Sequence, residues 1–83
     1  MADANRLLAL SMPTVTAQEV AAQITAQTGA VERLIGVGVV PPLATELAAQ
    51  ITSDPTSSER LSALSMVPAL AREVVAQIEA DRA

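Results

Sequence analysis

The residues of this chain that could do chemistry are three equally spaced glutamates, Glu19, Glu46 and Glu73. Carboxylates act as general acids and bases when a reacting group or a second titratable group lies beside them. Each glutamate is separated from the next by 27 residues. Such spacing indicates a repeated structural unit rather than a group of residues assembled for catalysis. We therefore expect no catalytic residue and a protein that is not an enzyme.

The composition excludes most other chemistry. The 83 residues contain no Cys, His, Lys, Phe, Tyr or Trp, and the net charge is −4. Without Cys and His we expect no zinc site of the usual kind and no disulfide, and without Lys no Schiff base. Lacking stacking aromatics and a basic surface, the chain is a poor candidate for binding nucleic acid or an anionic membrane. We therefore expect no cofactor, no metal, no nucleic acid and no membrane among its ligands.

The segment Gly36-Val37-Gly38 superficially resembles a glycine-rich phosphate loop. It has no third glycine and no lysine, and the corresponding segments of the chain read Ala-Leu-Ser. A phosphate loop needs its glycines between a strand and a helix, with a lysine that reaches the phosphates. We therefore interpret the segment as the end of a helix.

An internal repeat of 27 residues covers almost the whole chain, without insertion or deletion. It predicts one domain, residues 1–83, built of units 3–29, 30–56 and 57–83, called here units one, two and three. Seven positions are invariant: Arg6, Arg33 and Arg60; Leu7, Leu34 and Leu61; Ala17, Ala44 and Ala71; Glu19, Glu46 and Glu73; Ala22, Ala49 and Ala76; Gln23, Gln50 and Gln77; Ile24, Ile51 and Ile78.

Each unit has the pattern of a short helix, a tight elbow and a longer helix. In the short helix, apolar residues recur at i and i+3, as at Leu34 and Val37. In the longer helix they recur at i, i+4 and i+8, as at Leu43, Leu47 and Ile51, which is typical of an amphipathic helix. The invariant Glu and Gln residues are expected on the opposite side of that helix, facing water.

Several residues predict where the helices begin and end. A small residue at the elbow (Ser11, Gly38 or Ser65) lets the chain reverse, and Pro41-Pro42 and Pro68 suit the first turn of the longer helix. Thr56 precedes Glu59 by three residues, as in a capping box. Thr14 or Thr16 is expected to cap the longer helix of unit one, and Gly29 to end it.

We therefore expect an all-α fold of about six short helices. A single helical hairpin cannot bury its own apolar stripe, whereas three in tandem can, either as a compact bundle or as a small curved stack. A core without aromatic side chains buries little area per residue. Its stability is expected to be low, and self-association would supplement it, so an oligomer is expected.

The repeated charged residues are Arg6, Arg33 and Arg60 together with the three glutamates. They are interpreted mainly as structural ion pairs that join a short helix to a longer one, within a unit or between units. The alternative is that they contact a ligand or partner.

The elbows carry the apolar side chains that we consider first as a partner-binding surface. They are Met12, Val39, Val40, Met66 and Val67. Apolar side chains at a turn usually fill the core between helices, and flexible ones such as Met are also common at binding surfaces.

The segment Arg-Leu-x-x-Leu-Ser-Met followed by Ala-x-Glu-Val-x-Ala-Gln-Ile in units one and three, with Pro-Pro-Leu-Ala-x-Glu-Leu in unit two, resembles helical segments of small virion proteins of tailed bacteriophages. The resemblance covers nearly the whole chain. It implies a head-fibre, capsid-decoration or minor structural protein, bound to itself or to a virion shell protein, in a particle assembled in the bacterial cytoplasm.

The Leu-Ser-Met and Val-Gly-Val elbows are also similar in outline to the first loop of the ubiquitin-associated domain. That resemblance implies a cytoplasmic helical module that grips a peptide or a partner helix. The leading expectation is the virion structural protein, and the helical binding module is the alternative.

Overall fold

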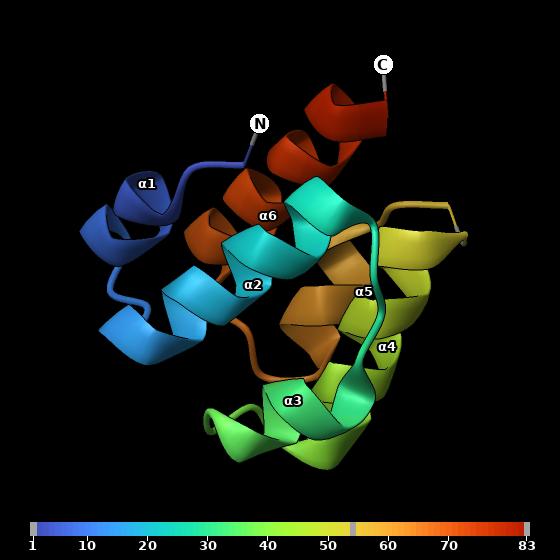
Figure 1. The fold of residues 1–83 in the computed structure, drawn as a ribbon, viewed down its shortest axis with the longest axis horizontal. Coiled ribbons are helices and arrows are strands. Elements are labelled where there is room, and N and C mark those ends of the chain that lie inside the picture. The colour runs from blue at the N-terminus through green and yellow to red at the C-terminus, as the bar shows by residue number, and fades with distance from the viewer. Residues whose placement is uncertain (1, 54, 83) are drawn as a thin grey trace.

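The structure is a computed structural model that describes residues 2–53 and 55–82. Within these ranges every regular element is a helix, as the sequence predicts (Figure 1). Each unit contributes a short helix and then a longer one. The helices are α1 (Ala4–Ala9), α2 (Thr14–Ala26), α3 (Val31–Gly36), α4 (Pro41–Thr52), α5 (Ser58–Ala63) and α6 (Pro68–Arg82).

The three short helices end with the same hydrogen-bonded turn. In unit one the Ser11 amide donates to the Leu8 carbonyl and the Met12 amide to the Leu7 carbonyl, which is the Schellman pattern. Units two and three repeat both bonds. The residue that reverses the chain has φ of +80° at Ser11, +100° at Gly38 and +89° at Ser65. The predicted small residue at the elbow is therefore confirmed, with a left-handed backbone as its reason.

The longer helices begin at proline in two of the three units. Pro41 and Pro68 are the first residues of α4 and α6, as predicted. In unit one, Pro13 is the residue before α2, and its side chain makes no capping bond. The prediction that Thr14 or Thr16 caps this helix is wrong. Thr16 lies inside α2, buried, and its hydroxyl donates to the Val37 carbonyl of unit two at 2.6 Å.

Two other predicted helix ends are also wrong. Ser57, not Thr56, caps α5, because its hydroxyl accepts from the Arg60 amide. The Thr56 hydroxyl instead bonds the Glu79 carboxylate at 2.6 Å. Helix α2 ends at Ala26, and its C-cap Gln27 has a left-handed backbone two residues before Gly29.

The three units close into a ring, which decides between the bundle and the stack. Helix α1 of unit one packs against α6 of unit three, α2 packs against both α3 and α6, and α4 packs against α5. The molecule measures 28 × 23 × 22 Å and has a Cα radius of gyration of 10.8 Å. The chain is thus a closed bundle with approximate threefold symmetry, in which the short helix of each unit packs on the longer helix of the unit before it, and α2 also packs against α6.

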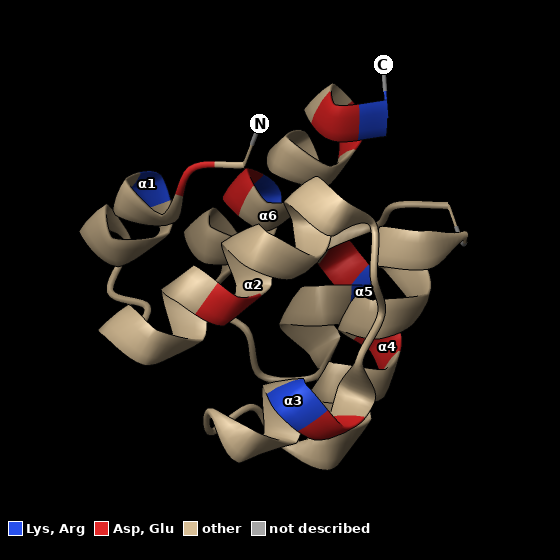
Figure 2. Cartoon of the chain, in the orientation of Figure 1, with Lys and Arg blue, Asp and Glu red and all other residues tan. Residues whose placement is uncertain are grey.

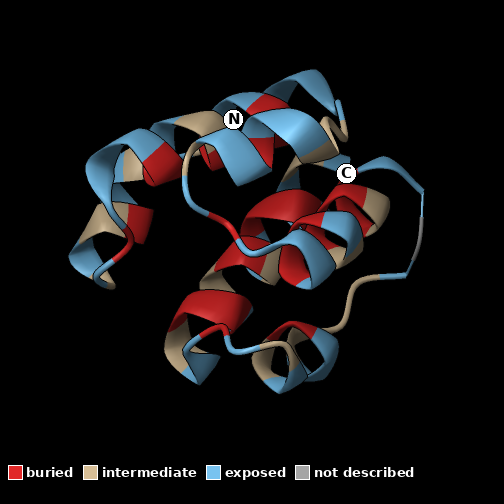
Figure 3. Ribbon diagram, turned by 90° about the horizontal axis from the view of Figure 1, so that it is seen from below, coloured by how far each residue is buried: buried red, intermediate tan, exposed pale blue. Residues whose placement is uncertain are grey.

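The core follows the repeat. One side of every helix is buried and turned toward the other helices (Figure 3). Leu, Ile, Val, Ala and Met fill this interior, and the fully buried side chains recur at equivalent places in the units. These are Leu7, Leu34 and Leu61; Val20, Leu47 and Val74; Ala17, Ala44 and Ala71; and Ile24, Ile51 and Ile78.

Candidate functional site

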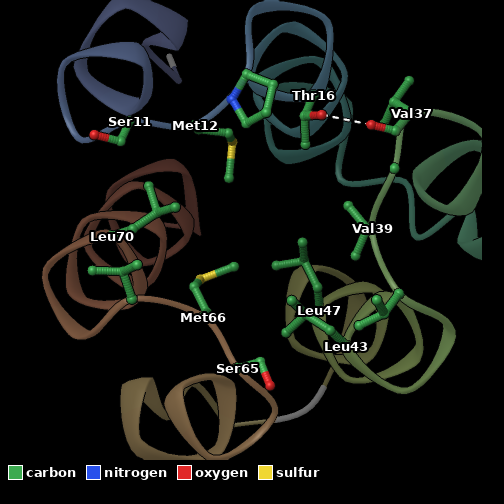
Figure 4. Close-up of a pocket in the computed structure, with 14 residues that line it drawn as sticks. Ser11, Met12, Thr16, Val37, Val39, Leu43, Leu47, Ser65, Met66 and Leu70 are labelled. Carbon is green, nitrogen blue, oxygen red and sulfur yellow. Dashed lines mark hydrogen bonds between the residues drawn. The ribbon is translucent and has the colours of Figure 1, made fainter.

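An apolar pocket of about 310 Å³ opens where the three elbows meet (Figure 4). Met12, Val39 and Met66 enter it from the three units, and Leu43, Leu47 and Leu70 of the longer helices complete its walls. The other lining residues are Ser11, Pro13, Thr16, Val37, Gly38, Val40, Ser65 and Val67.

The elbow geometry explains why these side chains converge. Met12, Val39 and Met66 each directly follow the left-handed residue of a Schellman turn, where a contact back onto the helix is usual. They are 6%, 9% and 7% exposed, so they belong to the core as well as to the pocket. Val40 and Val67, the next residues along the chain, are 51% and 57% exposed. We call this set of five the elbow cluster.

The five side chains of the elbow cluster are the same five that the sequence predicted as a partner-binding surface. The structure brings them together around one pocket, although they come from all three units. Val40 and Val67 are its exposed members, and Pro13 takes the equivalent place in unit one. That a partner binds them stays a prediction.

Among residues 2–53 and 55–82, no charged side chain lines the pocket. The elbow segments 10–16, 37–43 and 64–70 contain no ionisable residue at all, and the charged residues that the structure describes lie elsewhere on the helices and near the chain ends (Figure 2). The Thr16 hydroxyl is bonded to the Val37 carbonyl. The pocket therefore offers mainly hydrocarbon, and an ion placed there would lose its hydration without gaining a counter-charge.

The predicted arginines and glutamates form ion pairs that join different units. Arg33 lies 3.0 Å from Glu19 of unit one, Arg60 lies 2.9 Å from Glu46 of unit two, and Arg6 lies 3.2 Å from Glu73 of unit three. The arginine side chains are 56–66% exposed and the glutamates 13–15%. Each pair is therefore a structural contact between a short helix and the preceding unit's longer helix, and the three glutamates lie in three separate interfaces.

Buried glutamines complete these interfaces, whereas the sequence pattern predicted them, wrongly, to face water. Gln50, with 0% exposure, accepts from the Ser57 amide and donates to both the Ser57 carbonyl and the Glu46 carboxylate. Gln23 makes the same contacts with Ala30 and Glu19. Gln77 makes them with Asp3 and Glu73. Gln is invariant at these positions, but invariance alone does not indicate burial, because Ala22 and Ala76 beside two of the glutamines are also invariant and are exposed.

Other site classes find no support in the part of the chain that the structure describes. Among residues 2–53 and 55–82, no group of acidic side chains is arranged to hold a metal ion. In the same ranges no helix combines the length and apolarity needed to cross a membrane. Gly36 ends α3 and Gly38 forms the elbow, as the sequence interpretation of this segment requires.

Each unit contains two helices in the described part of the chain. No protein-family model matches the chain, and neither a curated protein nor a solved structure is similar enough to count as a match.

Proposed function

We propose that this chain is a non-enzymatic interaction module that receives an apolar group of a protein partner in the elbow pocket. The observation that carries the proposal is the pocket itself. About 310 Å³ of space opens among three elbows that carry no charge. This volume lies at the lower end of the range for ligand-binding pockets, about 300–1,000 Å³.

The shape of the elbow pocket and the lack of charge in the elbow segments favour a partner segment that protrudes and is uncharged. Two copies that met elbow to elbow would place one hollow against another and leave both unfilled, so the site suits a convex partner better than its own copy. The mouth lacks the basic residues that attract an anionic membrane, and the chain has a net charge of −4. The occupant would be an apolar side chain or a short cluster of them, on a helix end or loop of another protein.

A virion shell protein is the candidate partner that the phage resemblance implies. The approximate threefold symmetry favours it, because one copy could sit on a threefold axis of an assembly and present three similar elbows to three identical subunits. Mass spectrometry of phage particles purified from the host that carries this gene tests this role. The chain should then be present at a fixed ratio to the shell protein, and its absence from the particles would overturn the virion role while leaving the pocket proposal intact.

The pocket proposal is tested with peptides selected from a random library of about a dozen residues, displayed on a carrier and panned against the folded chain. We expect enriched peptides with clustered Leu, Ile, Phe or Trp and no acidic residue. The double variant Val40→Asp with Val67→Asp should abolish their binding, because it places two carboxylates at the mouth. Both positions directly precede a helix, where Asp stabilises the helix, so folding should survive.

Val15 provides the matched control. It is 62% exposed, more than Val40 and Val67, and it does not line the pocket. Val15→Asp should leave peptide binding unchanged. Binding that survives the double variant, or that is lost equally in Val15→Asp, would show that the elbow pocket is not the site.

A further inference from the structure

The three interfaces of the ring share one set of polar contacts. Each combines an Arg–Glu pair with a buried Gln that bonds both backbone groups of the residue directly before a short helix. We name each interface by the two units that it joins. Interfaces one–two and two–three join units that are consecutive in the chain. Interface three–one joins residues 67 and 74 positions apart, such as Arg6 with Glu73 and Asp3 with Gln77.

Interface three–one therefore needs no particular connection between its two units. Its hydrogen bonds and ion pair would be the same if unit one came from another molecule. Equivalent surfaces of this kind allow an element to be exchanged between copies at little cost, because every interaction broken within one molecule forms again with its partner. What decides between the closed monomer and the exchanged form is the connection that must straighten.

The connection between α2 and α3 is suited to act as the hinge. It spans only the four residues 27–30, and Gln27 within it adopts a left-handed backbone with φ of +57°. Short, strained hinges favour exchange, since opening relieves the strain. We propose that unit one, with α1 and α2, exchanges between two copies of this chain and gives a domain-swapped dimer of two closed rings.

The exchange would build each elbow pocket from two molecules. Met12 of one copy would meet Val39 and Met66 of the other, in the arrangement that the monomer shows around one pocket. The dimer would carry two complete pockets. If the elbow pocket binds a partner as proposed above, the dimer is a bivalent form of the module, although the exchange itself does not depend on that function.

Charge exchange at interface three–one tests the swap. Arg6→Glu and Glu73→Arg each place like charges at this interface within one molecule. A swapped dimer that contains one copy of each variant restores opposite charges at both copies of this interface. Arg6 of one copy then faces Glu73 of the other, and the two substituted side chains, at positions 6 and 73, also face each other with opposite charges. After the two variants are unfolded in urea and refolded together, light scattering should show several-fold more dimer than when they refold separately. Refractive index must provide the concentration, because the chain has no Trp or Tyr.

The other two interfaces supply matched controls. If unit one exchanges, interface one–two also forms between copies, so Arg33→Glu mixed with Glu19→Arg should give the same rescue. Interface two–three stays within each copy, so Arg60→Glu mixed with Glu46→Arg should give none. Rescue of no mixture would overturn the swap, and rescue of the third mixture would overturn the assignment to unit one.

A variant of the hinge keeps the proposal testable if a charge variant fails to fold. Gln27→Ala removes the side-chain bond to the Asp81 carbonyl and serves as the control. Gln27→Gly removes that bond as well and also removes the cost of the left-handed backbone from the closed form. The dimer fraction of the otherwise unchanged Gln27→Gly chain, refolded at high concentration, should fall several-fold. A dimer fraction that is negligible in the unchanged chain at every concentration would also overturn the proposal.

Discussion

At the scale of the residue, the elbows show how one backbone conformation selects small side chains. Ser11 and Ser65 have φ of +80° and +89°, in a region that L-residues rarely adopt. Gly38 occupies the equivalent place in unit two at no such cost. The serines therefore keep a modest local strain, which the surrounding Schellman hydrogen bonds maintain.

Ser11→Gly and Ser65→Gly should each stabilise the fold by up to about 1 kcal/mol, because glycine adopts the left-handed conformation freely. Gly38→Ser should destabilise it by a similar amount, and for conformational reasons alone, since a Cβ there meets no atom within 4 Å. Urea unfolding followed by circular dichroism measures all three. Gly36→Ala is the matched comparison, because Gly36 ends α3 without a positive φ and its Cβ would also meet open space, so this change should stabilise the helix rather than destabilise it. A Ser→Gly change that destabilises the protein would contradict this account.

At the scale of the element, the sequence predicts the positions of the helices correctly, but it does not predict the roles of several residues that flank them. The repeat and the apolar spacing placed each short and long helix, and the prolines placed the starts of α4 and α6. Gly29 was interpreted as a helix end, but its role is close packing. A Cβ at Gly29 would lie 2.7 Å from the Ala48 carbonyl oxygen of α4. A close contact of this kind between two units depends on how the units pack in space, and the spacing of residues along the chain does not predict that packing.

The buried glutamines give the element scale its own prediction. Gln50→Met keeps the length and approximate volume of the side chain and removes its amide. The Ser57 amide would then lose its partner inside the interface between units two and three, while the Ser57 carbonyl would keep only the Leu61 amide and Glu46 only Arg60. Leaving buried polar groups unpaired costs about 1–3 kcal/mol. The same urea unfolding measures the loss, and Gln18→Met, on the exposed side of α2, should change stability little. Equal effects of the two variants would show that the buried amide does not hold the units together.

At the scale of the whole molecule, the repeat predicted one domain of three units but left a bundle and a stack equally open. The periodicity of the apolar residues predicts which face of each unit is buried, but it does not predict the rotation that relates one unit to the next. Here that rotation returns unit three to unit one, and Arg6 with Glu73 repeats the contact of Arg33 with Glu19. The elbow pocket is a consequence of this closure, because Met12 and Met66 meet only in a ring. The sequence could therefore nominate the elbow cluster one residue at a time, but not its convergence.

Closure predicts that the chain can begin at a different unit. A permutant that runs through residues 30–83 and continues with 3–29 keeps the 27-residue spacing across its new junction. It links units three and one and cuts the chain between units one and two. Since one short connection replaces another of similar length, the entropy of closing the ring should change little. The junction must unwind the last residues of α6, which costs the bond from Arg82 to the Gln50 carbonyl, about 1 kcal/mol.

The permutant should therefore keep the helix content of the parent and unfold cooperatively, slightly less stable than the parent in urea. A second permutant that begins at Leu47 cuts α4 at a fully buried position and should lose most of its helix content. Circular dichroism and urea unfolding of the two chains separate the cases. If the permutant that begins at residue 30 does not fold, the three interfaces are not interchangeable, and the symmetry of the ring would be one of backbone shape rather than of energy.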